Sequence, residues 1–134
     1  MTKYKTATYF VFSALSAALA SEALAADDGQ WRIYSEEPNG DVHFFDATRV
    51  SRTDDLRRAW SRVRYKTSVM GAASFQSLVE IDCAKETEQI LQNTFFSDKD
   101  WKKPSMNTDT TEKPKRSIVK GSAMERLSEL LCDQ

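Results

Sequence analysis

Two cysteines, Cys83 and Cys132, constrain the fold of this chain more than any other feature, because a secretion signal precedes them. An exported chain with an even, minimal number of cysteines is expected to join them in one disulfide. That bond would tie the middle of the sequence to its end across 49 positions, from residue 83 to residue 132. For a loop of this length the chain-entropy model gives a stabilisation of about 4 kcal/mol. We therefore predict a structural role for both thiols.

The secretion signal occupies the first residues of the chain. Lys3 and Lys5 form a basic start, Ala7–Ala20 is uncharged and largely apolar, and Ala23–Ala25 supplies the small residues that signal peptidase accepts. Cleavage is predicted after the last of these, with Ala18–Ala20 as an alternative site. The apolar stretch is short for a bilayer crossing and no second one follows, so no membrane span is expected. No cysteine lies near either cut, so no lipid anchor is expected.

Cleavage defines a signal peptide of residues 1–25 and leaves 109 of the 134 residues, enough for one small domain. We place that domain at residues 30–133. The mature chain carries 17 basic and 19 acidic residues, a formal net charge of −2. This balance argues against a dedicated nucleic-acid binder. The compartment expected for the mature chain is the periplasm, the medium or the cell surface.

Short strands are expected in the first half of the domain. Trp31–Tyr34 and Val42–Phe45 flank Glu37–Asp41, whose Asn-Gly pair readily takes the positive φ angles of a hairpin turn. Further on, the segment 75–83 alternates in polarity, with Phe75, Val79, Ile81 and Cys83 on one face. This period directs Cys83 toward the core.

The clearest local signal is a C-terminal helix. Ser122 and Glu125 have the spacing of a capping box, in which each side chain accepts a hydrogen bond from an exposed backbone N–H. An apolar stripe at helical spacing follows, made of Met124, Leu127, Leu130 and Leu131. Cys132 lies at the flank of this stripe, so its disulfide would hold the end of the helix to the sheet.

Two segments are ambiguous, and the polar segment that follows them is predicted as a loop. Leu56–Val63 has helical spacing, although Arg62, Arg64 and Lys66 alternate as in a strand, and periodicity slightly favours a helix. The segment 88–96 fits neither helical nor strand periodicity. The segment 97–115 is polar and interrupted by two prolines, which predicts a long exposed loop.

Taken together, these segments resemble the surface-adhesin protein E family of proteobacteria over roughly the whole mature chain. The most specific matches are Ile81-Asp82-Cys83-Ala84 and the Gly121-Ser122 helix that ends in Cys132; Trp31, Phe45-Asp46, Trp60, Val79-Glu80 and Lys120 complete the order. The resemblance implies an α+β domain in which a small antiparallel sheet is packed by the C-terminal helix, with the two cysteines bridged. It also implies that segments 58–66 and 88–96 are strands.

The same resemblance implies adhesion, meaning that a protein at the cell surface binds host extracellular-matrix or plasma proteins and tends to form a homodimer. The sequence departs from the family in lacking the lipid-anchor cysteine, and segment 67–74 offers no motif onto which ligand-binding residues could be transferred. An alternative function is therefore a soluble periplasmic structural or accessory protein with no host ligand.

The residue inventory argues against an enzyme. His43 is the only histidine, and a lone strand histidine is more often structural than a general base. Cysteines committed to a disulfide are neither nucleophiles nor metal ligands, and four glycines form no phosphate loop. We expect no catalytic residue, metal or cofactor.

Two surface patches remain as candidate binding sites for a host or envelope protein. On a strand, Arg62, Arg64 and Lys66 would form a row that could bind carboxylates or sulfates, although a solvated sheet face explains the same pattern. In the loop, Trp101 lies among lysines, with Lys102 and Lys103 directly after it. This tryptophan is either an anchor for a partner or a residue that folds back over the core.

Overall fold

Seven strands and one helix make up the part of the chain that the structure describes. The computed structural model describes residues 29–133. Its elements are β1 (Trp31–Glu36), β2 (Val42–Thr53), β3 (Leu56–Val69), β4 (Ala72–Asp82), β5 (Thr87–Phe96), β6 (Ser105–Asp109), β7 (Arg116–Ser117) and α1 (Ala123–Cys132). The predicted signal peptide, residues 1–25, lies outside the described residues.

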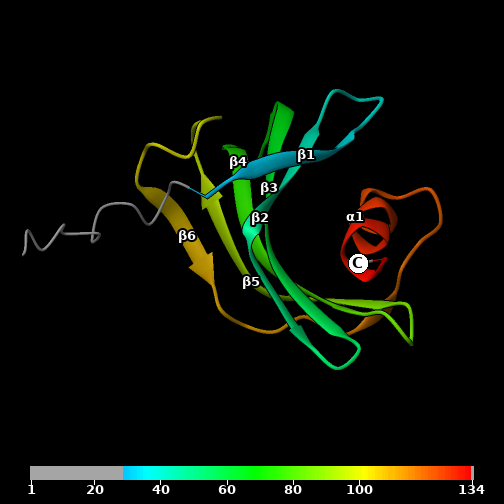
Figure 1. Ribbon diagram of the computed structural model, residues 1–134. Helices are drawn as coiled ribbons and strands as arrows, with labels where there is room; N and C mark the ends of the chain where they lie inside the picture. Colours follow the sequence, from blue (N-terminus) through cyan, green and yellow to red (C-terminus); the bar gives the residue numbers. More distant parts are fainter. Residues whose placement is uncertain (1–28, 134) are drawn as a thin grey trace, which may run out of the picture.

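The strands form one antiparallel sheet whose order follows the sequence from β1 to β6, and β7 pairs with β5 beside β6. Figure 1 shows the long strands curving around α1, which lies on the inner side of the sheet. The predicted fold, an antiparallel sheet packed by a C-terminal helix with one disulfide, is confirmed. Within residues 29–133, no helix is long and apolar enough to cross a membrane.

The hydrophobic core lies between the sheet and the helix. Its fully buried members alternate along the central strands and follow the helical stripe: Tyr34, Phe45, Ala59, Val79, Ile81, Leu127 and Leu131. We call the side of the sheet that bears these residues the inner face. The disulfide between Cys83 and Cys132 closes the end of this core, as the alternation of β4 predicted.

The predicted turn and helix cap are present, each with a local difference. In the β1–β2 hairpin the Gly40 N–H donates to the Glu37 carbonyl at 2.9 Å, and Gly40 alone takes a positive φ, 93°. At α1 the Ser122 hydroxyl accepts from the Glu125 N–H at 3.2 Å, but the Glu125 carboxylate accepts from Gly121 rather than from Ser122. The predicted boundaries hold because each signal needs only a few adjacent residues.

The helical spacing of Leu56–Val63 was misleading, since these residues lie in β3, and segment 88–96 lies in β5. Both assignments agree with the family resemblance. The predicted loop 97–115 was also wrong in part, because β6 pairs there with the outer edge of β5. A polar, exposed strand is typical of a sheet edge, where charge and polarity discourage further pairing.

Candidate binding surface

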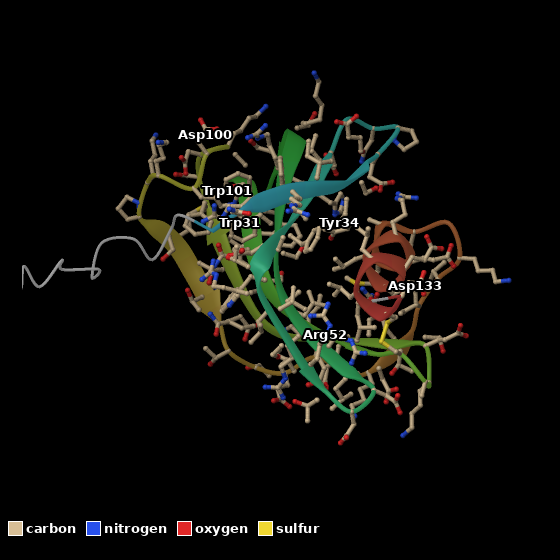
Figure 2. The ribbon with its side chains drawn as sticks, viewed as in Figure 1. Trp31, Tyr34, Arg52, Asp100, Trp101 and Asp133 are labelled. Atoms are coloured by element: carbon tan, nitrogen blue, oxygen red, sulfur yellow. A yellow bond between two sulfur atoms is a disulfide. The ribbon has the colours of Figure 1, made fainter. Side chains whose placement is uncertain are left out.

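The outer face of the sheet, opposite α1, has an arginine at its centre instead of an apolar cluster. The guanidinium carbon of Arg62 lies 4.1 Å from the ring centroid of Trp31 and 4.8 Å from that of Trp101. Its Nε donates to the Gln76 side-chain oxygen at 2.8 Å, across the β3–β4 pair. Arg62 is only 7% exposed. We call Trp31, Arg62 and Trp101 the stack; Figure 2 shows its two tryptophans beside each other, away from α1.

Trp101 is held in an unusual backbone conformation. Its φ is 55°, in the left-handed region that bulky side chains rarely adopt and that costs roughly 1–2 kcal/mol. Several contacts offset this cost: the indole N–H donates to the Phe75 carbonyl at 3.3 Å, and the ring packs edge-on against Phe44 at 5.8 Å. The surrounding structure therefore fixes the position of Trp101, as happens for strained residues at functional sites.

Arg64 joins the loop after β5 to the end of β3. Its guanidinium carbon lies 5.4 Å from the Phe44 ring and 5.6 Å from the Trp101 ring. Its Nε donates to the Lys99 carbonyl at 3.2 Å, and a terminal nitrogen lies 3.6 Å from the Asp100 carboxylate. In return, the Lys99 ammonium donates to the Lys66 carbonyl at 3.3 Å. The two basic patches that the sequence presented separately are one surface.

The loop itself is fixed at its first residues. The Asp98 carbonyl accepts from the Ser74 hydroxyl at 2.5 Å, and one Asp98 carboxylate oxygen accepts from the Lys102 N–H at 3.0 Å. This backbone hydrogen bond holds the pKa of Asp98 below its ordinary value. The exposed cations at this end of the sheet are therefore attached to an ordered frame. We call them the basic ridge, which consists of Arg64, Lys66, Lys99, Lys102 and Lys103.

A second arginine, paired with a carboxylate, packs next to the stack. Arg49 lies 5.9 Å from the ring centroids of both Trp31 and Trp60 and pairs with Asp46, which is fully buried. Burial acts to raise the pKa of Asp46, but hydrogen bonds from Thr48 and Arg49 outweigh it, so the pKa lies below its ordinary value. All three tryptophans of the chain thus lie on the outer face.

The structure places the predicted candidates unequally. The sequence pattern implied that Arg62 lies on a solvated face. The structure differs, because two tryptophans cover this side chain. Trp101 folds back over the sheet, and Lys66, Lys102 and Lys103 are exposed. Sequence reasoning missed Trp31 and Gln76 as partners of Arg62. The only signal for these partners in the sequence was an arginine between bulky side chains of a central strand. Which residues lie next to that arginine can be inferred only once the pairing register of the strand is known.

The groups of this surface are suited to recognition of a partner. Among residues 29–133, no cysteine is free and no group of three or more histidine, cysteine or acidic side chains is placed to hold a metal ion. What the surface does offer is a rigid aromatic centre bordered by exposed cations. Interfaces between proteins concentrate their binding energy in such aromatic and arginine residues.

Comparison with known proteins gives one family and one fold. The model of the family described as surface-adhesin protein E matches residues 31–133. Among solved structures, crystal form II of Haemophilus influenzae protein E superposes with a TM-score of 0.58 at 9% sequence identity. The match covers 68% of this chain and 80% of that one, and at this identity it shows the fold alone. No curated protein matches the sequence.

Proposed function

We propose a binding function for this chain, which belongs to the surface-adhesin protein E family. In this proposal it is an exported, non-enzymatic protein that contacts extracellular-matrix or plasma proteins of a host. Family membership supports adhesion as the class of function. We choose this surface because the stack and the basic ridge are joined: Arg64 contacts both Trp101 and Lys99.

The residues of this surface are proposed to play two different parts. Arg64, Lys66, Lys102 and Lys103 would meet carboxylates or sulfates of the partner directly, with arginine able to bind them in bidentate fashion. Arg62 would act as a positioning residue, because it is buried and holds Trp101 in place. Trp101 would supply the central apolar contact through the part of its ring that remains exposed.

Export is the second part of the proposal. We propose that residues 1–25 are removed as a signal peptide and that residues 30–133 form the mature domain. Separating cells into periplasmic extract, outer-membrane fraction and medium tests this, together with protease treatment of intact cells. Protein at the surface or in the medium supports a host ligand. Protein confined to the periplasmic extract would contradict adhesion and support the alternative of a periplasmic accessory protein.

A homodimer is the third part of the proposal, and the family tendency to dimerise supports it. Of the two edge strands, β1 and the polar β6, we choose the outer edge of β1 as the site for strand addition, because Ile33 is 53% exposed there. Sedimentation of the mature chain should show a dimer that Ile33→Lys dissociates. A monomer at all concentrations would contradict this part and leave the binding surface untouched.

The binding surface is tested with purified extracellular-matrix and plasma proteins immobilised for surface plasmon resonance. The ridge variant replaces Arg64, Lys66, Lys102 and Lys103 with serine. The matched control replaces four exposed cations elsewhere: Arg32, Lys85, Lys115 and Lys120. We expect the ridge variant to lose affinity by about tenfold or more and to lose most of its salt dependence, whereas the control keeps both. Equal binding by wild type and ridge variant would remove this surface from consideration.

A further inference from the structure

The inner face of the sheet and the start of α1 border a half-open cavity of about 340 Å³. Its floor comes from side chains of β3, β4 and β5, and its roof from Val119 and the first turn of the helix. Most of the lining is apolar, including Val63, Phe75, Ile90 and Met124. This cavity lies on the face of the sheet opposite the stack, so it is independent of the binding surface described above.

The cavity exists because small residues meet in the middle of the sheet. Ser61 of β3 and Ser77 of β4 are directly opposite each other, between the larger pairs Val63–Phe75 and Ala59–Val79. Above them, the first residue of the helix is Ala123. Bulky side chains at these three positions would fill the space as the rest of the core is filled. Small side chains at these three positions leave the space open between floor and roof.

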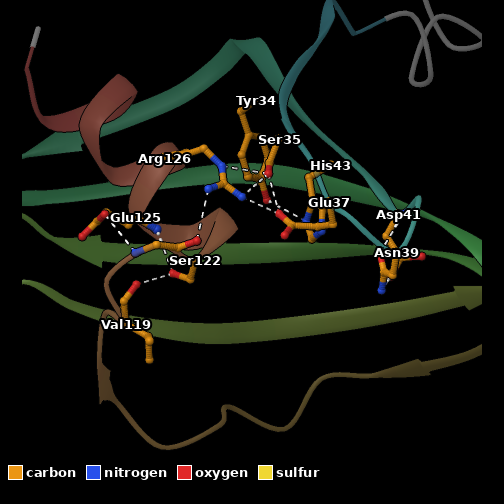
Figure 3. Close-up of polar contacts among 11 residues, drawn as sticks. Tyr34, Ser35, Glu37, Asn39, Asp41, His43, Val119, Ser122, Glu125 and Arg126 are labelled. Atoms are coloured by element: carbon orange, nitrogen blue, oxygen red, sulfur yellow. Dashed lines mark hydrogen bonds and ion pairs between the residues drawn. The ribbon is translucent and has the colours of Figure 1, made fainter.

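Hydroxyl groups and one imidazole converge on the apolar walls. The Tyr34 hydroxyl lies 3.0 Å from the Ser61 hydroxyl, and His43 Nδ1 lies 3.5 Å from the same tyrosine oxygen. Figure 3 shows Tyr34 and His43 next to each other, to the side of the helix. Burial raises the pKa of Tyr34 to about 12 and lowers the pKa of His43, so both are uncharged near neutral pH. Two linked hydroxyls can donate one further hydrogen bond and accept others.

The charged groups around the cavity are already paired. Glu88, 4% exposed, binds Arg116 at one side, and Glu37 binds Arg126 at 2.5 Å at the other. A ligand with its own charge would find no free counter-charge among these groups and would lose its hydration on entry. An uncharged ligand that carries one hydroxyl would satisfy the Tyr34–Ser61 pair and bury its apolar part against the walls.

We propose that this cavity binds a small uncharged ring compound of about two fused rings that carries a single hydroxyl group. Size supports this class. An engineered cavity of about 150 Å³ holds one benzene molecule, and this one has more than twice that volume. It also lies within the range of about 300–1,000 Å³ that is typical of ligand pockets. The exposed lining residues, Arg116 and Val119, mark the entrance between β7 and α1.

Three naphthalene derivatives substituted at the same ring position test the proposal by isothermal titration calorimetry of the mature chain. Naphthol carries the hydroxyl, methylnaphthalene lacks it, and naphthoate carries a charge. We expect naphthol to bind roughly fivefold more tightly than methylnaphthalene, and naphthoate to bind at least about tenfold more weakly than naphthol. No binding of naphthol, or naphthoate binding as tightly as naphthol, would overturn the proposal.

Two variants locate the site. Ala123→Phe fills the cavity from its roof and should reduce naphthol affinity by about tenfold or more, whereas Leu130→Phe adds bulk to an exposed position of the same helix and should leave it unchanged. Ser61→Ala combined with Tyr34→Phe removes both hydroxyls without adding volume, so this double variant should abolish the preference for naphthol over methylnaphthalene even if Ala123→Phe fails to fold. Unchanged naphthol affinity in a folded Ala123→Phe, or an unchanged preference in the double variant, would contradict this site.

Discussion

The two faces of the sheet solve the same packing problem in opposite ways. Within residues 29–133 the outer face has no helix over it, so long side chains of the sheet and its loop cover one another, with Arg62 buried between Trp31 and Trp101. The inner face is covered by α1, yet its small residues Ser61 and Ser77 leave a cavity. A charged side chain can thus complete a core, while a helix can cover a face without filling it.

Contacts at both ends of α1 hold the helix on the inner face. At its start, Arg126 donates to the Ser35 hydroxyl at 2.8 Å and pairs with Glu37, as Figure 3 shows. At its end, Cys132 is bonded to Cys83, and Arg57 donates to the Leu131 carbonyl at 3.2 Å. The outer face has no comparable covalent link, so removing each contact should affect the two faces differently.

Loss of the disulfide should have the largest effect. Replacing Cys83 and Cys132 with alanine should lower the free energy of unfolding by about 2–5 kcal/mol, because the unfolded chain is no longer constrained. Urea titration followed by circular dichroism measures this. All three tryptophans lie on the outer face, so their emission in the folded variant should match the wild type. A wild-type chain whose stability is unaffected by a reductant that breaks the bond would contradict this prediction.

Arg62→Ala should come next and should act on the outer face. The stacking of Arg62 on two half-buried rings predicts a loss of about 2 kcal/mol in the free energy of unfolding and a red shift of tryptophan emission. Arg62→Lys keeps the charge but not the planar stack, so it should recover only part of the loss. Arg32→Ala, an exposed arginine on β1, is the control and should change stability little. Equal losses at Arg62 and Arg32 would show that the stack contributes nothing.

Arg126→Gln should have a smaller effect, on the inner face. Its side chain is 38% exposed, so the loss of its bonds to Ser35 and Glu37 should cost about 1 kcal/mol. A double-mutant cycle with Glu37→Gln isolates the pair, and thermal unfolding of the four proteins measures it. Additive effects of the two substitutions would mean that the pair is not coupled.

The smallest effect should be a pH dependence from His43. Burial holds its pKa below the ordinary 6.5, so the unfolded chain takes up a proton before the folded one does. Stability should therefore fall as the pH decreases from neutral through 6.5 to the lower folded pKa. His43→Phe should flatten this slope. Carboxylates whose pKa is lowered, such as that of Glu37, titrate at more acidic pH. They therefore do not contribute to the slope in the pH range where His43 titrates. The same slope in both proteins would contradict a buried neutral histidine.

Features that depend on a few adjacent residues were predicted better than features that depend on how the strands pair. The β1–β2 turn, the Ser122 cap and the inward direction of Cys83 each depend on a few adjacent residues, and all three are present. The helical spacing around Trp60 was misleading because β3 is a central strand with both faces covered, which removes a clean alternation of apolar and polar residues.

The two candidate sites depend on neighbours that the sequence does not place. Arg62 is buried only because Trp31 of β1 and Trp101 of the loop after β5, which are distant in sequence, both pack on it. The cavity depends on the register that sets Ser61 opposite Ser77. Composition and spacing could indicate basic and aromatic residues, but not that they form one surface, nor that small residues coincide beneath the helix.

The central claim is that the two faces bind different ligands independently, and crossing the two sets of variants tests it most directly. Naphthol and the tightest-binding protein from the matrix and plasma panel would each be titrated against the ridge variant and against Ala123→Phe. The account predicts that the ridge variant keeps naphthol affinity and loses salt-dependent protein binding, and that Ala123→Phe does the reverse. A folded variant of either kind that loses both activities together would contradict it.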